Sequence, residues 1–248
     1  MGRAMGIWGP VTASVDWCEA NYVHTPYVAE LFNTLSSLAM VLAGALGLIL
    51  HARVLERRIL VAFAALMGVG VGSVLFHATL RFGLQLADEL PMVYLVLLIV
   101  DILYGPKPAL RAGLILSAVG LTVLCVFTRG ETESTVFRWG FSSFEVASLV
   151  GAAGLYRTGR DRERRALYRR GMVAYALGIL AWSSELQLCP ALSALPLNPQ
   201  LHALWHVLVS AGFYALLTFI AAEQLARRGE FPEVAWVAGV LPRVTRQA

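Results

Sequence analysis

The stretch LHALWHVLVSAGFYALLTFIAA, residues 201–222, decides the fold of this chain. It is an apolar run long enough to cross a bilayer as one helix, because such a helix needs about 20 residues. Six further runs of similar character precede it. The seven predicted membrane helices cover residues 30–51, 59–80, 86–104, 109–128, 139–156, 168–188 and 201–223.

Composition points to the same class of protein. Hydrophobic residues make up 58% of the 248 residues and charged residues 15%, whereas a soluble domain carries about 25% charged residues. Seven spans with short loops use nearly the whole chain, so we expect one all-α, polytopic membrane domain over residues 1–248. It would comprise an outer segment (1–29), a seven-helix bundle (30–223) and a cytoplasmic tail (224–248).

The basic residues predict how the bundle is oriented. The loop between the fifth and sixth runs is the most basic, with Arg157, Arg160, Arg162, Arg164, Arg165, Arg169 and Arg170. Because cytoplasmic loops of membrane proteins are enriched in Arg and Lys, we expect the N-terminus outside and the C-terminus in the cytoplasm. The net charge of +4 then indicates contact with anionic lipids and not with nucleic acid.

Three histidines predict a metal site near the outer face. His202 and His206 are four residues apart, so both imidazoles face the same side of the last helix. His77 lies at the same depth, near the end of the run AALMGVGVGSVLFHATL (residues 64–80). Three histidine nitrogens with an open fourth position are the ligands of a catalytic zinc. One membrane histidine alone is more often a hydrogen-bonding residue between helices, but three at one depth favour the metal.

Two more polar residues are expected at this depth. Asp88 lies as far beyond the turn between the second and third helices as His77 lies before it, and Ser73 is one helical turn from His77. The pair in the last helix lacks the Glu of an H-E-x-x-H protease, so Asp88 is the candidate general base. The alternatives are a helix cap for Asp88 and a packing role for Ser73 among glycines.

The segment DWCEANYVHTPYVAE, residues 16–30, is rich in oxygen donors of the kind that calcium prefers. The candidate ligands are Asp16, Glu19, Asn21 and Glu30, together with the backbone carbonyl of Trp17. The spacing is not that of an EF-hand, because no glycine occupies the sharp turn. A solvated acidic loop is the alternative.

Three other features yield expectations. Cys18 and Cys189 both fall on the outer side, where an oxidising compartment permits a disulfide between them. Cys125 is expected to be buried near the end of the fourth helix. Glu145 and Glu185 either line the cavity or bond a neighbouring helix, and for Glu145 we expect the helix–helix bond. The tail FPEVAWVAGVLPRV (residues 231–244) is expected to lie along the membrane interface.

Five sequence blocks carry a resemblance to a known family. They are W-G-P-x-T-x-x-x-D-W-C-E-x-N-Y (8–22), Y-V-A-E-L-F-N-T-L-S-S (27–37), G-S-x-x-F-H (72–77), Q-L-x-D-E-L-P-M-x-Y (85–94) and L-H-x-x-W-H (201–206). With these blocks the chain resembles the alkaline ceramidases. More widely, it resembles the seven-helix zinc membrane hydrolases that include the adiponectin-receptor-like proteins.

The resemblance implies a role for each candidate residue. It implies zinc ligands at His77, His202 and His206, a catalytic pair at Ser73 and Asp88, and calcium ligands at Asp16, Trp17, Glu19, Asn21 and Glu30. It also implies hydrolysis of the ceramide amide to sphingosine and a fatty acid. The alternatives are a lipid-binding receptor with a structural zinc and a hydrolase of another lipid amide.

The resemblance also sets expectations about partners and location. They are a ceramide-type lipid and the bilayer, with no nucleic acid and no obligate protein partner. The membrane would be the inner membrane of a bacterium, or the ER or Golgi membrane of a eukaryote.

Overall fold

Seven helices and a small sheet make up the computed structural model, which describes residues 6–246. They are α1 Leu31–His51, α2 Arg57–Thr79, α3 Phe82–Tyr104, α4 Pro108–Phe127, α5 Gly130–Thr158, α6 Arg162–Ser193, α7 Leu201–Arg227, β1 Pro232–Val237 and β2 Leu241–Arg246. All seven predicted helices are present. The fifth and sixth are longer than expected, because apolar periodicity marks the membrane part of a helix and not its polar ends. At one such end the Asp161 carboxylate accepts a hydrogen bond from the Arg164 amide at 2.8 Å and caps α6.

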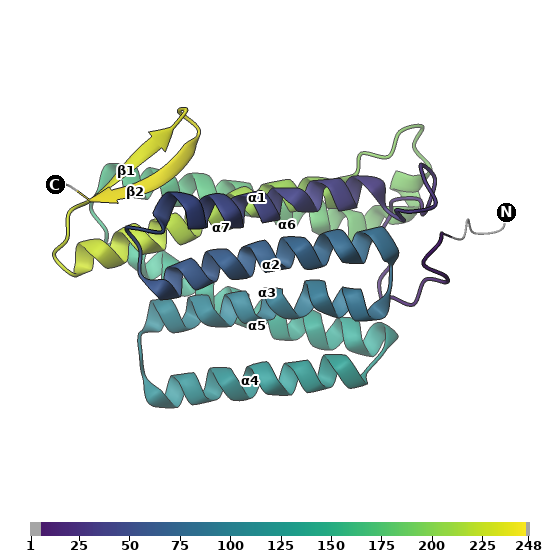
Figure 1. Cartoon of the computed structure of the whole chain (residues 1–248), viewed down its shortest axis with the longest axis horizontal. Helices are drawn as coiled ribbons and strands as arrows, with labels where there is room; N and C mark the ends of the chain where they lie inside the picture. The colour runs from purple at the N-terminus through teal and green to yellow at the C-terminus, as the bar shows by residue number, and fades with distance from the viewer. Residues whose placement is uncertain (1–5, 247–248) are drawn as a thin grey trace.

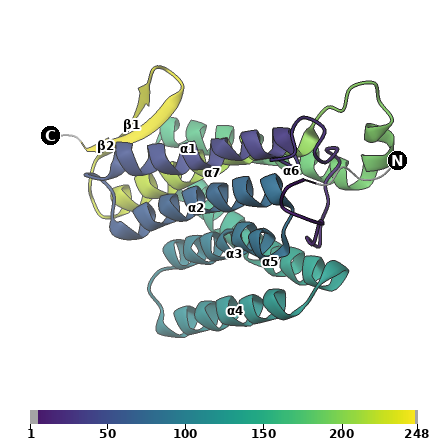
Figure 2. The same ribbon diagram turned by 45° about the vertical axis from the view of Figure 1, so that its right-hand side comes forward.

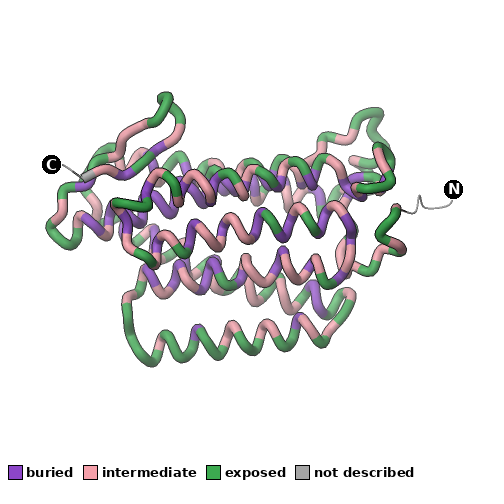
Figure 3. The backbone as a smooth tube through the Cα atoms, in the orientation of Figure 1, coloured by how far each residue is buried: buried purple, intermediate pink, exposed green. Residues whose placement is uncertain are grey.

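Five of the described helices are long and apolar enough to cross a membrane, namely α1, α2, α4, α6 and α7. The other two, α3 and α5, carry acidic side chains that are buried in the bundle. α4 lies at one edge of the bundle and is largely exposed (Figures 1 and 3). Its exposed residues include large apolar ones. Leu116 and Phe127 are 72% and 81% exposed. Such an apolar outer surface is typical of a helix that faces lipid.

α7 is the innermost helix. It packs chiefly against α1 and α6 and also contacts α2 and α5. Leu217, Phe219 and Ile220 on this helix are fully buried, and a helix that is apolar all round belongs to the centre of a bundle. The first turns of α7 are therefore held inside the protein, and they carry His202 and His206.

The N-terminal segment covers one end of the bundle (Figures 1 and 2). The amide of Ala13 donates to the carbonyl of Leu80 at 3.1 Å, and the amide of Ala29 donates to the carbonyl of Ala78 at 2.9 Å. These hydrogen bonds attach residues 13–29 to the end of α2. The segment thus closes the end of the bundle at which the three histidines lie.

A disulfide attaches the same segment to α6. Cys18 and Cys189 are bonded, with 5.5 Å between their Cα atoms, which confirms the predicted pair. The Asn198 amide donates to the Cys18 carbonyl at 2.9 Å, so the loop before α7 is joined as well. Cys125 is buried and is the one free cysteine of the described residues.

The tail corrects the all-α prediction. β1 and β2 pair antiparallel, with Val234 opposite Val244, and form a hairpin at the far end of the bundle (Figure 1). Ala238 and Gly239 have φ of 49° and 72°, and positive φ at both central residues is typical of the tight turns in hairpins. The prolines of the tail, Pro232 and Pro242, therefore lie in short strands and do not interrupt a helix.

Two side chains of the bundle hold the hairpin. The amide of Val244 donates to His51 Nε2 at 3.1 Å, and Tyr214 donates its hydroxyl to the Pro242 carbonyl at 2.8 Å. His51 is fully buried. This role of His51 leaves no local pattern in the sequence, because its partner Val244 lies 193 residues away.

Gly72 lets α2 approach α3 closely. A Cβ at this position would collide with the backbone carbonyl of Ala87. The neighbours in sequence are Ser73 on α2 and Asp88 on α3. The missing side chain therefore allows these two polar groups to lie together.

We expect Gly72→Ala to destabilise the protein by roughly 1–3 kcal/mol, because the added methyl forces α2 and α3 apart. The thermal unfolding midpoint in detergent measures the effect. Gly68→Ala on the same helix is the control, since a Cβ there meets no atom within 4 Å. Equal midpoints for the two variants would contradict the close approach.

Candidate metal centre

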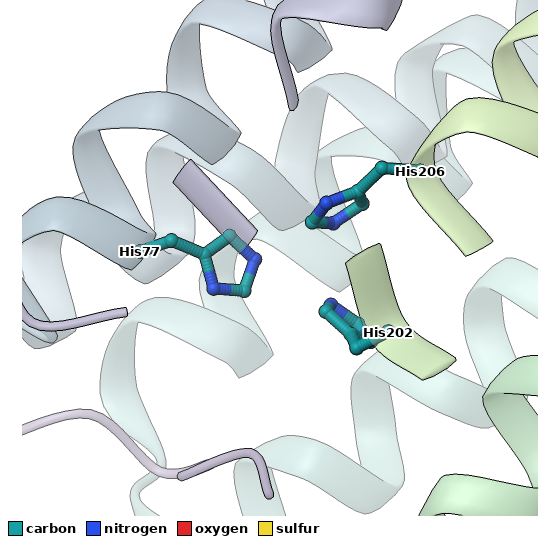
Figure 4. Close-up of side chains that lie close together, drawn as sticks. All are labelled: His77, His202 and His206. Atoms are coloured by element: carbon teal, nitrogen blue, oxygen red, sulfur yellow. The ribbon is translucent and has the colours of Figure 1, made fainter. Parts of the chain in front are cut away.

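The three predicted histidines converge from two helices. His77 comes from the last turns of α2, and His202 and His206 come from the first turns of α7 (Figure 4). Ring centroids are 5.1 Å apart for His77 and His202, 4.9 Å for His77 and His206, and 4.5 Å for His202 and His206. One nitrogen from each ring lies within 4.8 Å of the others. This group can hold a metal ion.

Hydrogen bonds orient two of the rings. His77 Nδ1 is 2.5 Å from Glu30 Oε2, and His206 Nδ1 is 2.9 Å from Ser36 Oγ. His77 Nε2 is buried and has no hydrogen-bond partner. In a metal-binding histidine, one ring nitrogen binds the metal and the other ordinarily makes a hydrogen bond. That hydrogen bond fixes the tautomer and the ring orientation.

Stacking and a backbone hydrogen bond position the third ring. His202 stacks on Trp17 with 3.6 Å between ring centroids, and its amide donates to Glu185 Oε2 at 2.6 Å. Glu185 Oε1 also accepts from the Cys18 amide at 3.2 Å. His202 Nδ1 is buried without a hydrogen-bond partner. Since unpaired buried nitrogens are costly, the orphaned atoms of His77 and His202 fit a metal ion between the rings.

Ser73 and Asp88 lie together beside the histidines. Ser73 Oγ is 3.0 Å from Ser37 Oγ, and the Ser73 hydroxyl also interacts with the Asp88 carboxyl. Both side chains are buried. The structure thus brings together all five residues that the sequence predicted at this depth.

A largely apolar cavity of about 370 Å³ begins at this group. Ser73, Asp88, His202 and His206 line one part of it. Apolar lining residues include Met92, Phe137, Trp205, Val209 and Phe213. The cavity suits a ligand with long hydrocarbon chains.

The cavity reaches the lateral surface of the bundle between α5 and α6. α5 packs against α3 and α4 and has few contacts with α6. Val146 on α5 and Leu186 on α6 line the cavity and are 59% and 41% exposed. An apolar molecule can therefore enter from the side, where α5 and α6 separate.

The predicted calcium residues lie next to the histidines, but several have partners within the protein. Glu19 accepts hydrogen bonds from the amides of Phe32 at 2.8 Å and Asn33 at 2.9 Å, at the N-terminus of α1. Burial raises the pKa of the Glu19 carboxyl, although these two amides favour its charged form. Glu30 contacts His77 and accepts from the Trp17 amide at 3.2 Å.

In the same loop Asp16 is exposed and Asn21 is half-buried. Asn21 Nδ2 donates to Asp16 Oδ1 at 2.9 Å. Asn21 Oδ1 is buried and has no partner. Among the described residues, the only set of three or more metal-ligating His, Cys, Asp or Glu side chains is the histidine triad.

The sequence prediction missed several residues that orient the ligands. Glu30 was expected to bind calcium, and the structure places it on His77; Ser36 and Ser37 were given no role. The signal was present, because Glu30, Asn33 and Ser37 form a polar stripe on a membrane helix.

Glu145 was expected to bond a neighbouring helix, with the cavity wall as the alternative. In the structure it does both, because it lines the cavity and its carboxyl lies next to the Tyr175 hydroxyl on α6.

Comparison with known proteins identifies the family. A family model described as ceramidase matches residues 9–245. The chain belongs to the ceramidase family. It is therefore a member of a family of hydrolases, as the five sequence blocks predicted.

Several relatives align over nearly their full length. Alkaline ceramidase of Arabidopsis thaliana is 31% identical over 246 residues, covering 96% of this chain and 94% of the relative. Alkaline ceramidase 3 of Mus musculus is 32% identical over 253 residues, with the same coverage. Alkaline ceramidase 1 of Homo sapiens is 29% identical and covers 84% of this chain and 81% of the relative.

We expect the purified protein to bind about one divalent metal ion per chain, as a three-histidine site does. His77→Ala, His202→Ala and His206→Ala should each lose most of it, measured by elemental analysis. His24→Ala is the control, because His24 lies outside the triad. A full metal content in the triple variant would contradict the site.

Proposed function

We propose that this member of the ceramidase family is a zinc-dependent hydrolase of the ceramide amide. The products are sphingosine and a free fatty acid. The observation that carries the proposal is the group of three buried histidines, two of which have an unpaired nitrogen, at one part of an apolar cavity beside Ser73 and Asp88. The names of the relatives support ceramide as the substrate.

The metal centre favours an enzyme over a receptor with a structural zinc. A structural zinc has four protein ligands, whereas a catalytic one keeps a position open. Among residues 6–246, no fourth His, Cys, Asp or Glu joins the three histidines. A hydrolase of another lipid amide is the second alternative, and a substrate panel separates it from a ceramidase.

The side chains around the site have distinct roles in the proposed reaction. Bound zinc would polarise the amide carbonyl and make the attacking water more acidic. Asp88 accepts a proton from that water and delivers one to the leaving amine nitrogen. The Ser73 hydroxyl donates a hydrogen bond to the carbonyl oxygen as its negative charge develops. The apolar wall holds the two hydrocarbon chains.

We propose that the chain forms one membrane domain with seven spans, an outer N-terminus and a cytoplasmic C-terminus. The basic residues after α5 support this orientation. The N-terminal segment and the hairpin lie at opposite ends of the bundle (Figure 2), as an odd number of spans requires. Substrate would enter from the bilayer between α5 and α6.

We also propose that calcium binds the outer loop. The ligands would be the side chains of Asp16, Glu19, Asn21 and Glu30 and the carbonyl of Trp17. The buried, unpaired Asn21 Oδ1 supports the proposal. Carboxylates that already accept hydrogen bonds keep further lone pairs for a cation. The ion would hold the segment that carries Trp17 and Glu30 against the histidines.

Hydrolysis of purified ceramides, with other lipid amides in the same panel, tests the activity. We expect Asp88→Asn to lower kcat roughly 100- to 10,000-fold, because the general base is lost. Ser73→Ala should lower kcat roughly 100- to 1,000-fold, because a donor to the oxyanion is lost. Both variants should keep their metal, which separates chemistry from folding. Wild-type activity in Asp88→Asn would remove it as the base.

Chelation of calcium tests the outer loop. We expect a calcium-selective chelator to lower the thermal midpoint and the activity while the histidine-bound metal stays in place. Asp16→Ala should show the low midpoint without chelator, and Glu131→Gln, an exposed acid at the start of α5, should behave as wild type. If chelation changes neither quantity, the segment is a solvated acidic loop.

A further inference from the structure

Glu145 is a buried carboxyl group that the proposed reaction does not use. It lies in the middle of α5, is 4% exposed and lines the cavity. Both of its carboxyl oxygens are buried, and the carboxyl interacts with the hydroxyl of Tyr175 on α6. Burying a carboxyl with so few hydrogen-bond partners in an apolar site is costly, so the feature requires an explanation.

The depth of Glu145 follows from the packing of α3 and α5. Gln85 Nε2 donates to Glu133 Oε2 at 2.8 Å, which sets these two positions at one level. Asp88 lies three residues beyond Gln85, and Glu145 lies twelve beyond Glu133. Both helices run in the same direction from this level. At 1.5 Å per residue, Glu145 lies about 13 Å deeper than Asp88.

The surroundings of Glu145 combine one polar group with an apolar wall. Tyr175 on α6 lines the same cavity, and its hydroxyl is next to the carboxyl. The Tyr175 ring packs edge-on against Phe213, with 6.0 Å between ring centroids. Leu149, one turn from Glu145, also lines the cavity. A carboxyl has about four lone-pair sites and the Tyr175 hydroxyl can fill only one of them, so a molecule in the cavity can supply a further hydrogen-bond partner.

We propose that Glu145 and Tyr175 bind a hydroxyl group on a hydrocarbon chain of the lipid substrate, at mid-chain. This inference rests on the proposed function, since it concerns the lipid that the same cavity takes. A hydroxyl both donates and accepts, so it can bond the carboxyl and the phenol together. The predicted depth excludes groups next to the amide, because Glu145 lies about 13 Å from the level of Asp88.

A neutral hydroxyl suits this site better than a charged group. A second carboxylate would be repelled by Glu145, and an ammonium group would have to leave water for an apolar cavity. A site built to bond a hydroxyl discriminates against a lipid that lacks it, because its own polar groups then stay unpaired. Glu145 and Tyr175 are thus specificity residues and not catalytic ones.

The test compares matched ceramides. The reference has no hydroxyl on the outer parts of its chains, and three others each carry one additional hydroxyl. The hydroxyl is at mid-chain on the acyl chain, at mid-chain on the sphingoid base, or next to the amide on the acyl chain. Two quantities are measured for the full chain in detergent, kcat/KM and the rise in thermal midpoint on lipid binding. The variants are Glu145→Leu, Glu145→Gln and Tyr175→Phe, with Ser143→Ala as the control, because Ser143 is exposed on the same helix and does not line the cavity.

We expect wild type to prefer one of the mid-chain hydroxylated ceramides to the reference by about tenfold in kcat/KM, the effect of one good hydrogen bond. Whether wild type prefers the ceramide with the hydroxyl on the acyl chain or the one with it on the sphingoid base tells which chain reaches Glu145. The ratio should fall toward one in Glu145→Leu, fall less in Glu145→Gln and Tyr175→Phe, and stay unchanged in Ser143→Ala.

The two measurements separate this inference from the proposed function. If every ceramide is hydrolysed and binds equally well, the inference is overturned and the function stands. If none is hydrolysed but a mid-chain hydroxyl raises the thermal midpoint through Glu145, the function is overturned and the inference stands. A preference that survives in Glu145→Leu would also overturn the inference, as would a preference for the hydroxyl next to the amide.

Discussion

The metal centre depends on holding three buried imidazoles so that one nitrogen of each faces the others. An imidazole has two nitrogens, and a partner at one of them directs the second toward the site. Glu30 performs this function for His77 and Ser36 for His206, while Trp17 stacks on His202. All three supporting residues belong to the chain between residues 17 and 36. One segment, the entry into α1, therefore orients ligands from both α2 and α7.

The need to hold this segment explains much of the outer end of the protein. The Cys18–Cys189 disulfide joins it to α6, and backbone hydrogen bonds join it to the end of α2. Glu185 contacts both Cys18 and His202, so the segment and the ligand are linked through one carboxylate. Displacement of this segment would change the metal centre without changing any ligand. A calcium ion in the outer loop would act on the same segment.

One group of polar side chains inside the bundle lies at the histidines, and Glu145 lies apart from it. Ser37, Ser73 and Asp88 lie in one network next to the histidines. Glu145 lies much deeper, with the Tyr175 hydroxyl beside it. Since a buried carboxyl with unfilled hydrogen-bonding capacity lowers stability, its presence in the cavity is more naturally related to a ligand than to the fold.

Local patterns along the sequence were sufficient for the bundle and for the identity of its central residues. Apolar length located seven helices. Equal distances from a turn placed His77 and Asp88 at one depth, and the outer start of the last helix placed His202 and His206 there. These inferences succeed because helix period and membrane depth are local properties of a chain. Only the tertiary structure decided that Glu30 contacts His77, that His51 holds the hairpin and that Glu145 lies beside Tyr175 in the cavity wall. Each of these depends on a contact between segments far apart in sequence, and no local pattern encodes it.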